Sequence, residues 1–240
     1  MPGITSLLKD LHEGRKLSDF ANQFIHYQNI ITKSETEFIQ SYASWIKKKG
    51  YRMNERLAKK IYAMAQNGIP TLPFTPATKL IVKEAVRTLQ SLEISIDTIL
   101  SQMQRLASSL PEYSTVLAMN GVGKVLAPRL IAEIGDIRRF HNRSSLIAYA
   151  GIDAPPYQSG TFESKQRSIF KRGNKYLRKT GFETMKCLKT HKPDDDDVYR
   201  FICKKEAEGK YFLTVYMAGL NKFLRIYYAR VKQLYSDIAV

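Results

Sequence analysis

The sequence predicts a mostly α-helical protein, in which a long coiled-coil helix precedes a compact domain that contains a helix-hairpin-helix motif. Three observations predict this fold. Aromatic and aliphatic residues recur at helical spacing in residues 7–65. A regular heptad pattern follows in residues 77–110. A Gly-x-Gly turn then separates two apolar segments of helical length.

The first predicted domain covers residues 1–76 and consists of amphipathic helices. Its apolar positions recur every three or four residues, as expected for helix faces that pack into a core. These positions are Phe20, Phe24, Tyr27, Ile31, Phe38, Tyr42, Trp45 and Ile46. Lysines at 47–49 followed by Gly50 predict the end of one helix. Residues 69–76 contain three prolines, which cannot continue a helix and therefore predict a linker.

The second predicted domain is a coiled-coil helix over residues 77–110. Its apolar residues alternate in steps of three and four, which is the seam pattern of a coiled coil. The seam consists of Val82, Ala85, Leu89, Leu92, Ile96, Ile99, Met103, Leu106 and Leu110. Because the period stays at 3.5 residues, the pattern favours pairing with a second copy, and hence a homo-oligomer. The alternative is a helix packed on its own domain.

The chain is strongly basic, with 38 Lys and Arg against 22 Asp and Glu and a formal net charge of +16. Such a charge favours a polyanionic partner, and DNA is the leading one. An anionic membrane surface would also attract it, but no segment is long and apolar enough to span or anchor. No signal-peptide pattern opens the chain. The two cysteines make neither a zinc pattern nor a disulfide framework, so we expect a cytoplasmic protein.

The positive charge is concentrated in the third predicted domain, residues 111–240. Residues 120–192 hold fifteen Lys and Arg and five acids, and residues 165–192 hold ten bases and one acid. A solvated face usually mixes both signs, so this run favours a nucleic-acid contact. The candidate nucleic-acid-binding residues are Gly121, Gly123, Lys124, Arg129, Lys165, Arg167, Lys171, Arg172, Asn174, Lys175 and Arg178.

The Gly-x-Gly turn at residues 121–123 carries the predicted helix-hairpin-helix motif. Glycines permit a tight turn with positive φ and allow a phosphate to come close. Free amides at the start of the following helix would then face the phosphate, without reading any base. The alternative is an ordinary corner between two helices.

Ser159 is the candidate nucleophile. It stands beside Gly160 in a polar loop, just before the basic run, where a large substrate can approach it. A serine that attacks a phosphodiester needs cations around the phosphate and a proton acceptor. The sequence supplies the cations but no local base, so the residues alone favour an ordinary loop serine. The four acids at 194–197 point in different directions, and we expect them to form a solvated loop or a helix N-terminus rather than a metal site.

Five blocks in fixed order resemble the C-terminal domain of the IS110 family of insertion-sequence transposases, also called IS116/IS902. The blocks are residues 120–123, 131–140, 146–152, 158–160 and 168–178. Residues 219–228 are similar to the terminal helix of that family, and the heptad segment is similar to its linker between domains.

The resemblance implies DNA transposition and recombination. Members of the family join this domain to an N-terminal RuvC-like domain, in which four acidic ligands hold Mg²⁺. The resemblance also implies that Ser159 is a nucleophile in a composite active site. It further implies a structured guide RNA and an oligomer assembled on DNA.

The N-terminal residues depart from the family. A RuvC-like domain opens with a strand that carries an aspartate, whereas residues 1–76 read as helices, without four acids to chelate a metal. We therefore expect a fragment without the metal-binding domain, with no metal or cofactor of its own. It would bind DNA but cleave little or none alone. The alternative is a non-catalytic nucleic-acid-binding remnant or regulator. A helix-hairpin-helix repair factor is a third option, against which the missing acidic or lysine-based catalytic set argues.

Overall fold

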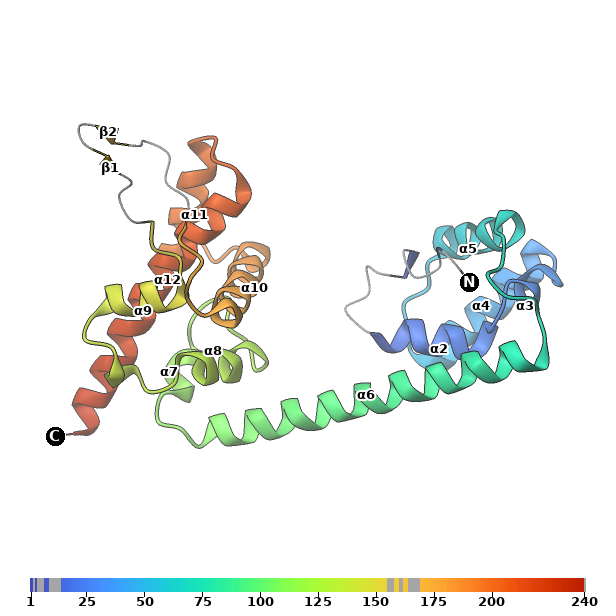
Figure 1. Ribbon diagram of the computed structural model, residues 1–240, viewed down its shortest axis with the longest axis horizontal. Coiled ribbons are helices and arrows are strands. Elements are labelled where there is room, and N and C mark those ends of the chain that lie inside the picture. Colours follow the sequence, from blue (N-terminus) through green and yellow to red (C-terminus); the bar gives the residue numbers. More distant parts are fainter. Residues whose placement is uncertain are drawn as a thin grey trace. The chain divides into compact units, whose positions relative to one another are not determined.

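The computed structural model describes residues 1, 3, 7–8, 14–154, 158–159, 162–163 and 169–239 of the chain. It confirms a mostly α-helical protein (Figure 1). The chain forms two compact units, residues 1–98 and 99–240, and each has its own core. In the described ranges, no helix is long and apolar enough to cross a membrane.

In the residues that the structure describes, the N-terminal unit contains four short helices and the first part of a long one. The helices are α2 (Gly14–Phe24), α3 (Gln28–Ile31), α4 (Glu35–Lys49), α5 (Glu55–Asn67) and α6 (Pro76–Ser108). The C-terminal unit contains the remaining elements. These are α7 (Tyr113–Leu117), α8 (Leu126–Ile134), η1 (Ile137–Arg139), α9 (Arg143–Ala150), β1 (Gln158–Ser159), β2 (Phe162–Glu163), α10 (Lys175–His191), α11 (Asp197–Ala207) and α12 (Phe212–Ile238).

Aromatic rings fill the core of the N-terminal unit. Phe20, Phe24, Phe38, Tyr42 and Trp45 are all buried and lie in ring contact with one another. They belong to the helix faces that the sequence pattern predicts, and their burial confirms those faces. At least five buried rings at this spacing give a small unit a large apolar contribution to its stability.

Ile31 is the exception, because it is 41% exposed instead of buried. Its predicted place in the core assumes that one helical period continues from Phe24. The structure interrupts the helix at Ile25, where φ is +37°, before α3 begins. The break shifts the register, so that Ile30 is fully buried in its place.

The end of α4 follows the prediction from sequence. Three lysines occupy its last turn, and Gly50 adopts the left-handed conformation with φ +72°. The amide of Gly50 donates to carbonyls of the last turn and so caps the helix.

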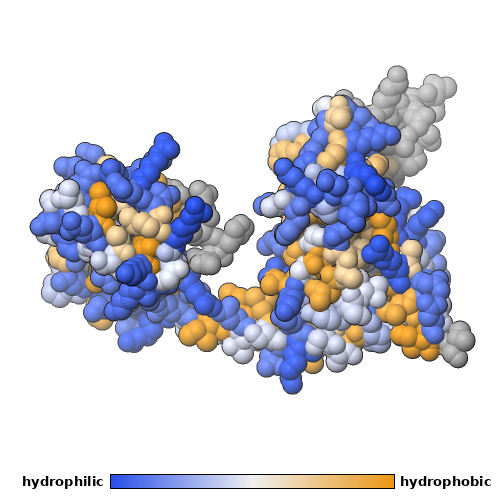
Figure 2. All heavy atoms as spheres, turned by 180° about the vertical axis from the view of Figure 1, so that it is seen from behind, coloured by the Kyte–Doolittle hydropathy of each residue, from blue (hydrophilic) through white to orange (hydrophobic). Residues whose placement is uncertain are grey.

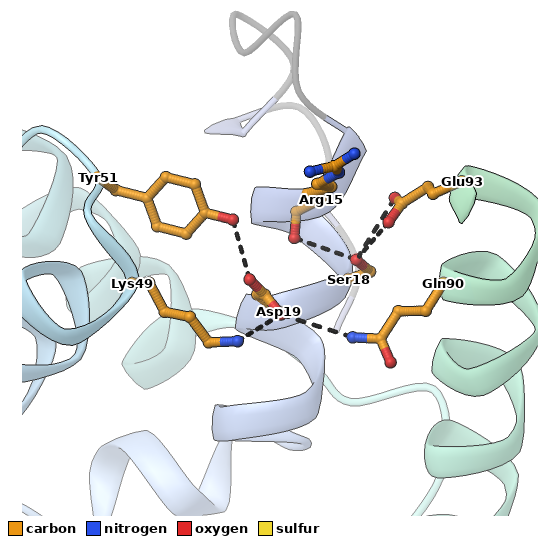
Figure 3. Close-up of polar contacts among 7 residues, drawn as sticks. All are labelled: Arg15, Ser18, Asp19, Lys49, Tyr51, Gln90 and Glu93. Carbon is orange, nitrogen blue, oxygen red and sulfur yellow. Dashed lines mark hydrogen bonds and ion pairs between the residues drawn. The ribbon is translucent and has the colours of Figure 1, made fainter. Parts of the chain in front are cut away.

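Polar side chains fasten α2 to the inner face of α6 within the N-terminal unit (Figure 3). The hydroxyl of Ser18 lies 3.4 Å from both carboxylate oxygens of Glu93. The amide of Gln90 donates to Asp19, and Arg15 forms an ion pair with Asp97. Through these contacts, one face of α6 is bound to α2 of the same unit.

Asp19 also joins α2 to the segment after α4. Its carboxylate accepts from Lys49 Nζ and from the hydroxyl of Tyr51, each at 2.9 Å. As Figure 3 shows, the Asp19 side chain therefore lies between two groups of donors, one from α6 and one from the end of α4. The side chain is largely buried, and these three contacts supply hydrogen-bond donors to its carboxylate.

The predicted heptad segment forms one helix as far as Ser108, and most of its seam residues are exposed. The seam residues 89, 92, 96, 99, 106 and 110 are between 41% and 63% exposed. Figure 2 shows one face of the molecule, with apolar side chains at the surface along this helix. The coiled-coil pairing itself stays a prediction.

Helix α12 forms the centre of the C-terminal unit. Leu220, Phe223, Leu224 and Tyr227 are buried between α12 and the helices packed around it, α9, α10 and α11. A Cβ on Gly181 would lie 2.4 Å from a methyl carbon of Leu220. The absence of a side chain at this point lets α10 approach α12 closely.

Candidate nucleic-acid interface

The turn between α7 and α8 contains the two glycines of the predicted hairpin. Gly121 has φ +80°, and a Cβ on it would lie 2.8 Å from the carbonyl oxygen of Thr184. Gly121 therefore faces α10 and allows the hairpin to pack there. A Cβ on Gly123 would meet nothing within 4 Å. The two glycines have different surroundings, and only Gly123 lies on the open side of the turn.

The open side of this turn carries free backbone donors and a cation. Leu126 and Ala127 donate to the carbonyl of Gly123, but the amides of Gly123, Lys124 and Val125 have no acceptor among the residues described. No side chain caps the start of α8. Lys124 is exposed, and no described acid pairs with it. This combination of free amides, helix N-terminus and cation is suited to bind an anion.

Arg129 has a partner inside the protein. Its guanidinium lies 3.4 Å from the carboxylate of Glu183 on α10, and both side chains are about one-third exposed. The charge of Arg129 is therefore partly neutralised, unlike that of Lys124.

The cations just before and at the start of α10 stack on neighbouring rings. Lys171 and Arg172 are exposed, and the Arg172 guanidinium lies 4.3 Å from the centre of the Phe170 ring. Lys175 Nζ lies 5.0 Å from the ring of Tyr176. These cations remain at the surface, where a phosphate can reach them.

Asn174 joins three elements of the C-terminal unit. Its side-chain oxygen accepts from the amides of Tyr176 and Leu177 and so caps α10. Its side-chain nitrogen donates to Glu133 at 2.8 Å and to the Tyr149 hydroxyl at 3.1 Å. The sequence predicts a nucleic-acid contact for Asn174, and the structure gives its side chain these internal partners.

Arg178 also bonds internally. It donates to the carbonyls of Ala150 and Gly173, at 2.9 and 3.1 Å. A Cβ on Gly173 would lie 2.4 Å from the nitrogen of Gly151, so the two glycine backbones touch. Together these contacts hold Gly151 and Gly173 against each other, at the two ends of the segment 152–172.

Backbone hydrogen bonds continue this closure beyond the glycines. The amide of Lys171 donates to Gly151, and the amide of Phe170 donates to Asp153, each at 3.0 Å. We call residues 152–172 the serine arm, because they contain Ser159. The paired backbones, together with Asn174 and Arg178, therefore close the base of the serine arm.

Ser159 lies on β1 within the serine arm. It pairs antiparallel with Phe162 of β2, and Gln158 pairs with Glu163. The Ser159 side chain lies outside what the structure describes, as do Lys165 and Arg167 entirely.

A tyrosine and an arginine that the sequence analysis did not select lie against the base of the serine arm. The Arg139 guanidinium lies 4.5 Å from the ring centre of Tyr149 and donates to the carbonyl of Ile134. The Tyr149 hydroxyl donates to the carbonyl of Glu133. The hydrogen bond from Asn174, and then that from Arg139, lower the pKa of Tyr149. Tyr149 lies among the apolar residues of α9, so nothing local in the sequence shows its polar contacts.

The acids at 194–197 form a helix N-terminus, as predicted. Asp196 accepts from the amides of Val198 and Tyr199 and so caps α11, and Asp197 pairs with Arg200. The bond with Arg200 lowers the pKa of Asp197. In the described parts of the chain, no three His, Cys, Asp or Glu side chains could hold a metal ion together.

The fold and this site define a class: basic α-helical domains in which an exposed Gly-x-Gly turn precedes a serine-bearing segment in the chain. Residues 113–200 match the transposase family IS116/IS110/IS902. The C-terminal unit therefore carries a transposase domain of that family.

Two curated relatives extend this similarity. The pilin gene-inverting protein of Moraxella bovis is 31% identical over 143 residues, which cover 58% of this chain and 44% of the relative. The protein of the same name from Moraxella lacunata gives the same identity and coverage. The chain thus spans less than half the length of these relatives.

Proposed function

We propose that this chain is the DNA-binding C-terminal part of a transposase or related DNA recombinase, with Ser159 as the nucleophile of a composite active site. The family of residues 113–200 supports the class of reaction. The relatives from Moraxella are named for the inversion of a gene, which is also a rearrangement of DNA.

The open side of the α7–α8 hairpin is the observation that carries this proposal. Gly123 leaves space where a side chain would stand, and the amides of residues 123–125 have no described acceptor. A DNA phosphate in this space would accept from those amides and lie beside Lys124. Such a helix-hairpin-helix contact binds the DNA backbone whatever the base sequence. It suits a protein that positions DNA for a separate chemical step.

The serine arm would bring the nucleophile to that DNA. In the proposed step, the Ser159 oxygen bonds to phosphorus and one bridging P–O bond breaks. The released strand end takes up a proton as an alcohol, and the serine proton passes to a base.

Metal chemistry would come from residues outside the described ones. The resemblance implies an acidic domain with Mg²⁺, and the described residues offer no such cluster. We also propose a structured guide RNA as a partner and an oligomer formed through α6.

Covalent capture tests the serine directly. The full chain is incubated with a separately supplied acidic domain of the family, magnesium, a structured guide RNA and nicked DNA of the element ends, and adducts are resolved on a denaturing gel. We expect a protein–DNA adduct that Ser159→Ala abolishes. Ser144→Ala is the matched control, because Ser144 is exposed in the same unit without a described side-chain partner. An adduct or strand transfer that survives Ser159→Ala eliminates the serine role.

A second candidate function is non-catalytic binding of nucleic acid. The absence of a three-ligand metal cluster in the described ranges favours it. In that case the chain binds DNA normally, but the capture experiment yields no adduct with either the wild type or Ser144→Ala.

A further inference from the structure

One surface of the C-terminal unit combines exposed aromatic rings with lysines. We propose that this surface binds the unpaired bases of a single-stranded nucleic acid. We call it the aromatic–lysine face. It consists of Lys179, Phe182, Lys186, Tyr211, Phe212 and Tyr216. The inference names a second ligand of this unit and does not require Ser159 to be a nucleophile.

The rings form a continuous row from α12 to α10. The ring centres of Tyr211 and Phe212 lie 4.7 Å apart, and those of Phe212 and Tyr216 lie 6.1 Å apart. Tyr216 then contacts Phe182 of α10, with ring centres 5.5 Å apart. The row therefore joins residues of two helices into one surface.

Two of these rings do not contribute to the core. Tyr211 is 64% exposed and Phe212 is 49% exposed, whereas Val215 in the same turn is fully buried. The buried side of α12 thus already has its apolar residues, and folding does not account for the two rings. Large exposed aromatic residues beside one another are typical of a surface that meets a ligand.

The charges beside the rings select the class of ligand. Lys179 and Lys186 are three residues before and four residues after Phe182, so they share its face of α10. Both are exposed, and neither has an acidic partner in the described part of the chain. Glu183 of α10 and Glu206 of α11 are already paired, Glu183 with Arg129 and Glu206 with Lys189. The free charge of this face is therefore positive.

A row of rings with free lysines beside it matches the chemistry of a single strand. Its phosphates pair with cations, and its bases stack on aromatic rings. A duplex offers the same phosphates, but its bases are already stacked on one another and are closed to protein rings. We therefore infer an unpaired strand, whether of DNA or of RNA.

Fluorescence anisotropy tests this inference on the full chain. The probes are a labelled strand of about 12 nucleotides as DNA and as RNA, an abasic strand of equal length, and a duplex. We expect Phe212→Ala to weaken single-strand binding by roughly tenfold, because one stacked base is lost. Affinity for the duplex and the abasic strand should not change. Comparison of the DNA and RNA strands identifies the natural source.

Phe212→Trp provides a direct signal of stacking. The only tryptophan of the chain, Trp45, is buried in the N-terminal unit and contributes a constant background. A tryptophan at position 212 should keep the affinity of the wild type, and its fluorescence should be quenched by base-bearing strands but not by the abasic strand.

Leu213→Ala is the matched control, because Leu213 is 44% exposed in the same turn and has no ring. It should leave single-strand affinity unchanged. Equal losses for Leu213→Ala and Phe212→Ala would instead indicate an apolar docking surface and overturn the inference. A smaller oligomer for Phe212→Ala would likewise assign the face to contacts between copies. A wild type that binds the abasic strand as well as the others would also refute it, while leaving the duplex-binding proposal intact.

Discussion

Tyr42 places its hydroxyl in the core of the N-terminal unit, where no described group bonds with it. Its ring packs well, with a centre 5.5 Å from that of Trp45. Burial raises the pKa of Tyr42 to about 12, because the phenolate would lose its hydration. The ring thus stabilises the unit, whereas the hydroxyl costs free energy.

Tyr42→Phe should therefore stabilise the N-terminal unit at neutral pH by up to roughly 1–3 kcal/mol, the cost of burying an unpaired polar group. The stability of the Tyr42→Phe variant should also depend less on pH than that of the wild type. Above pH 10, the ordinary tyrosine pKa, the unfolded wild type loses protons while folded Tyr42 stays neutral up to about pH 12. The free energy of unfolding of the wild type is therefore independent of Tyr42 titration below pH 10, and it falls as the pH rises from 10 to about 12.

Urea unfolding at pH 8 and pH 11 measures both effects. Trp45 fluorescence reports on the N-terminal unit, because the chain has no other tryptophan. The gain in stability from Tyr42→Phe should be larger at pH 11. A destabilised variant at pH 8 would mean that the hydroxyl has a partner and that this account of the core is wrong.

The two glycines of the hairpin should separate stability from binding. Gly121→Ala should destabilise the C-terminal unit by about 1–3 kcal/mol, because φ is positive and the new Cβ would clash with the Thr184 carbonyl. Gly123→Ala meets no atom, so stability should be retained. Its methyl group would occupy the proposed phosphate space and weaken duplex binding by roughly tenfold, about 1.4 kcal/mol.

Thermal unfolding and duplex titration of both variants check this pair. If Gly123→Ala binds duplex DNA like the wild type, the open side of the hairpin does not hold a phosphate. If Gly121→Ala is as stable as the wild type, the packing of the hairpin against α10 is less tight than the structure shows.

At the scale of elements, α6 presents two unlike faces. Within the N-terminal unit, Val86 is buried and Gln90 and Glu93 bond to α2. Leu92 and Ile96 lie on the exposed seam, and each is 55% exposed. A helix that needed only its own unit would have polar residues on the outer side, so the seam favours a partner helix.

The double variant Leu92→Lys with Ile96→Lys should abolish self-association, because two charges would enter an apolar seam. Helicity should not change, since both positions are exposed in the chain. Ser91→Lys with Ser95→Lys is the matched control: it adds the same two charges at exposed positions outside the seam and should keep the oligomer.

Sedimentation velocity gives the mass of each species. A wild type that sediments as a monomer, or a double variant that keeps the mass of the wild type, contradicts pairing through this seam.

At the scale of the whole molecule, the helices with a regular apolar period were the elements most readily predicted from sequence. The heptad run predicts α6, and the aromatic spacing predicts most of the N-terminal core. Ile31 shows the limit of this reasoning, because a single residue with positive φ, Ile25, changes the register of everything after it. A period carries no information about where a helix is interrupted.

The candidate site was less predictable, because its contacts join residues far apart in the chain. Asn174 and Arg178 stand in a basic run, and nothing local shows that their partners are Glu133 and the Ala150 carbonyl. Lys124 differs, since its exposure follows from the turn that contains it. Charge density thus predicts that a surface binds nucleic acid, but tertiary packing decides which cations remain free to do so.

The salt dependence of duplex binding tests the central claim, that the C-terminal unit holds DNA by its phosphates. Anisotropy is measured with a labelled duplex over a series of KCl concentrations, for the wild type, Lys124→Gln, and Lys48→Gln in the N-terminal unit. We expect binding that weakens steeply with salt, and a logarithmic slope that falls by about one for Lys124→Gln but not for Lys48→Gln. No affinity at low salt, or an affinity that salt does not change, would contradict the claim.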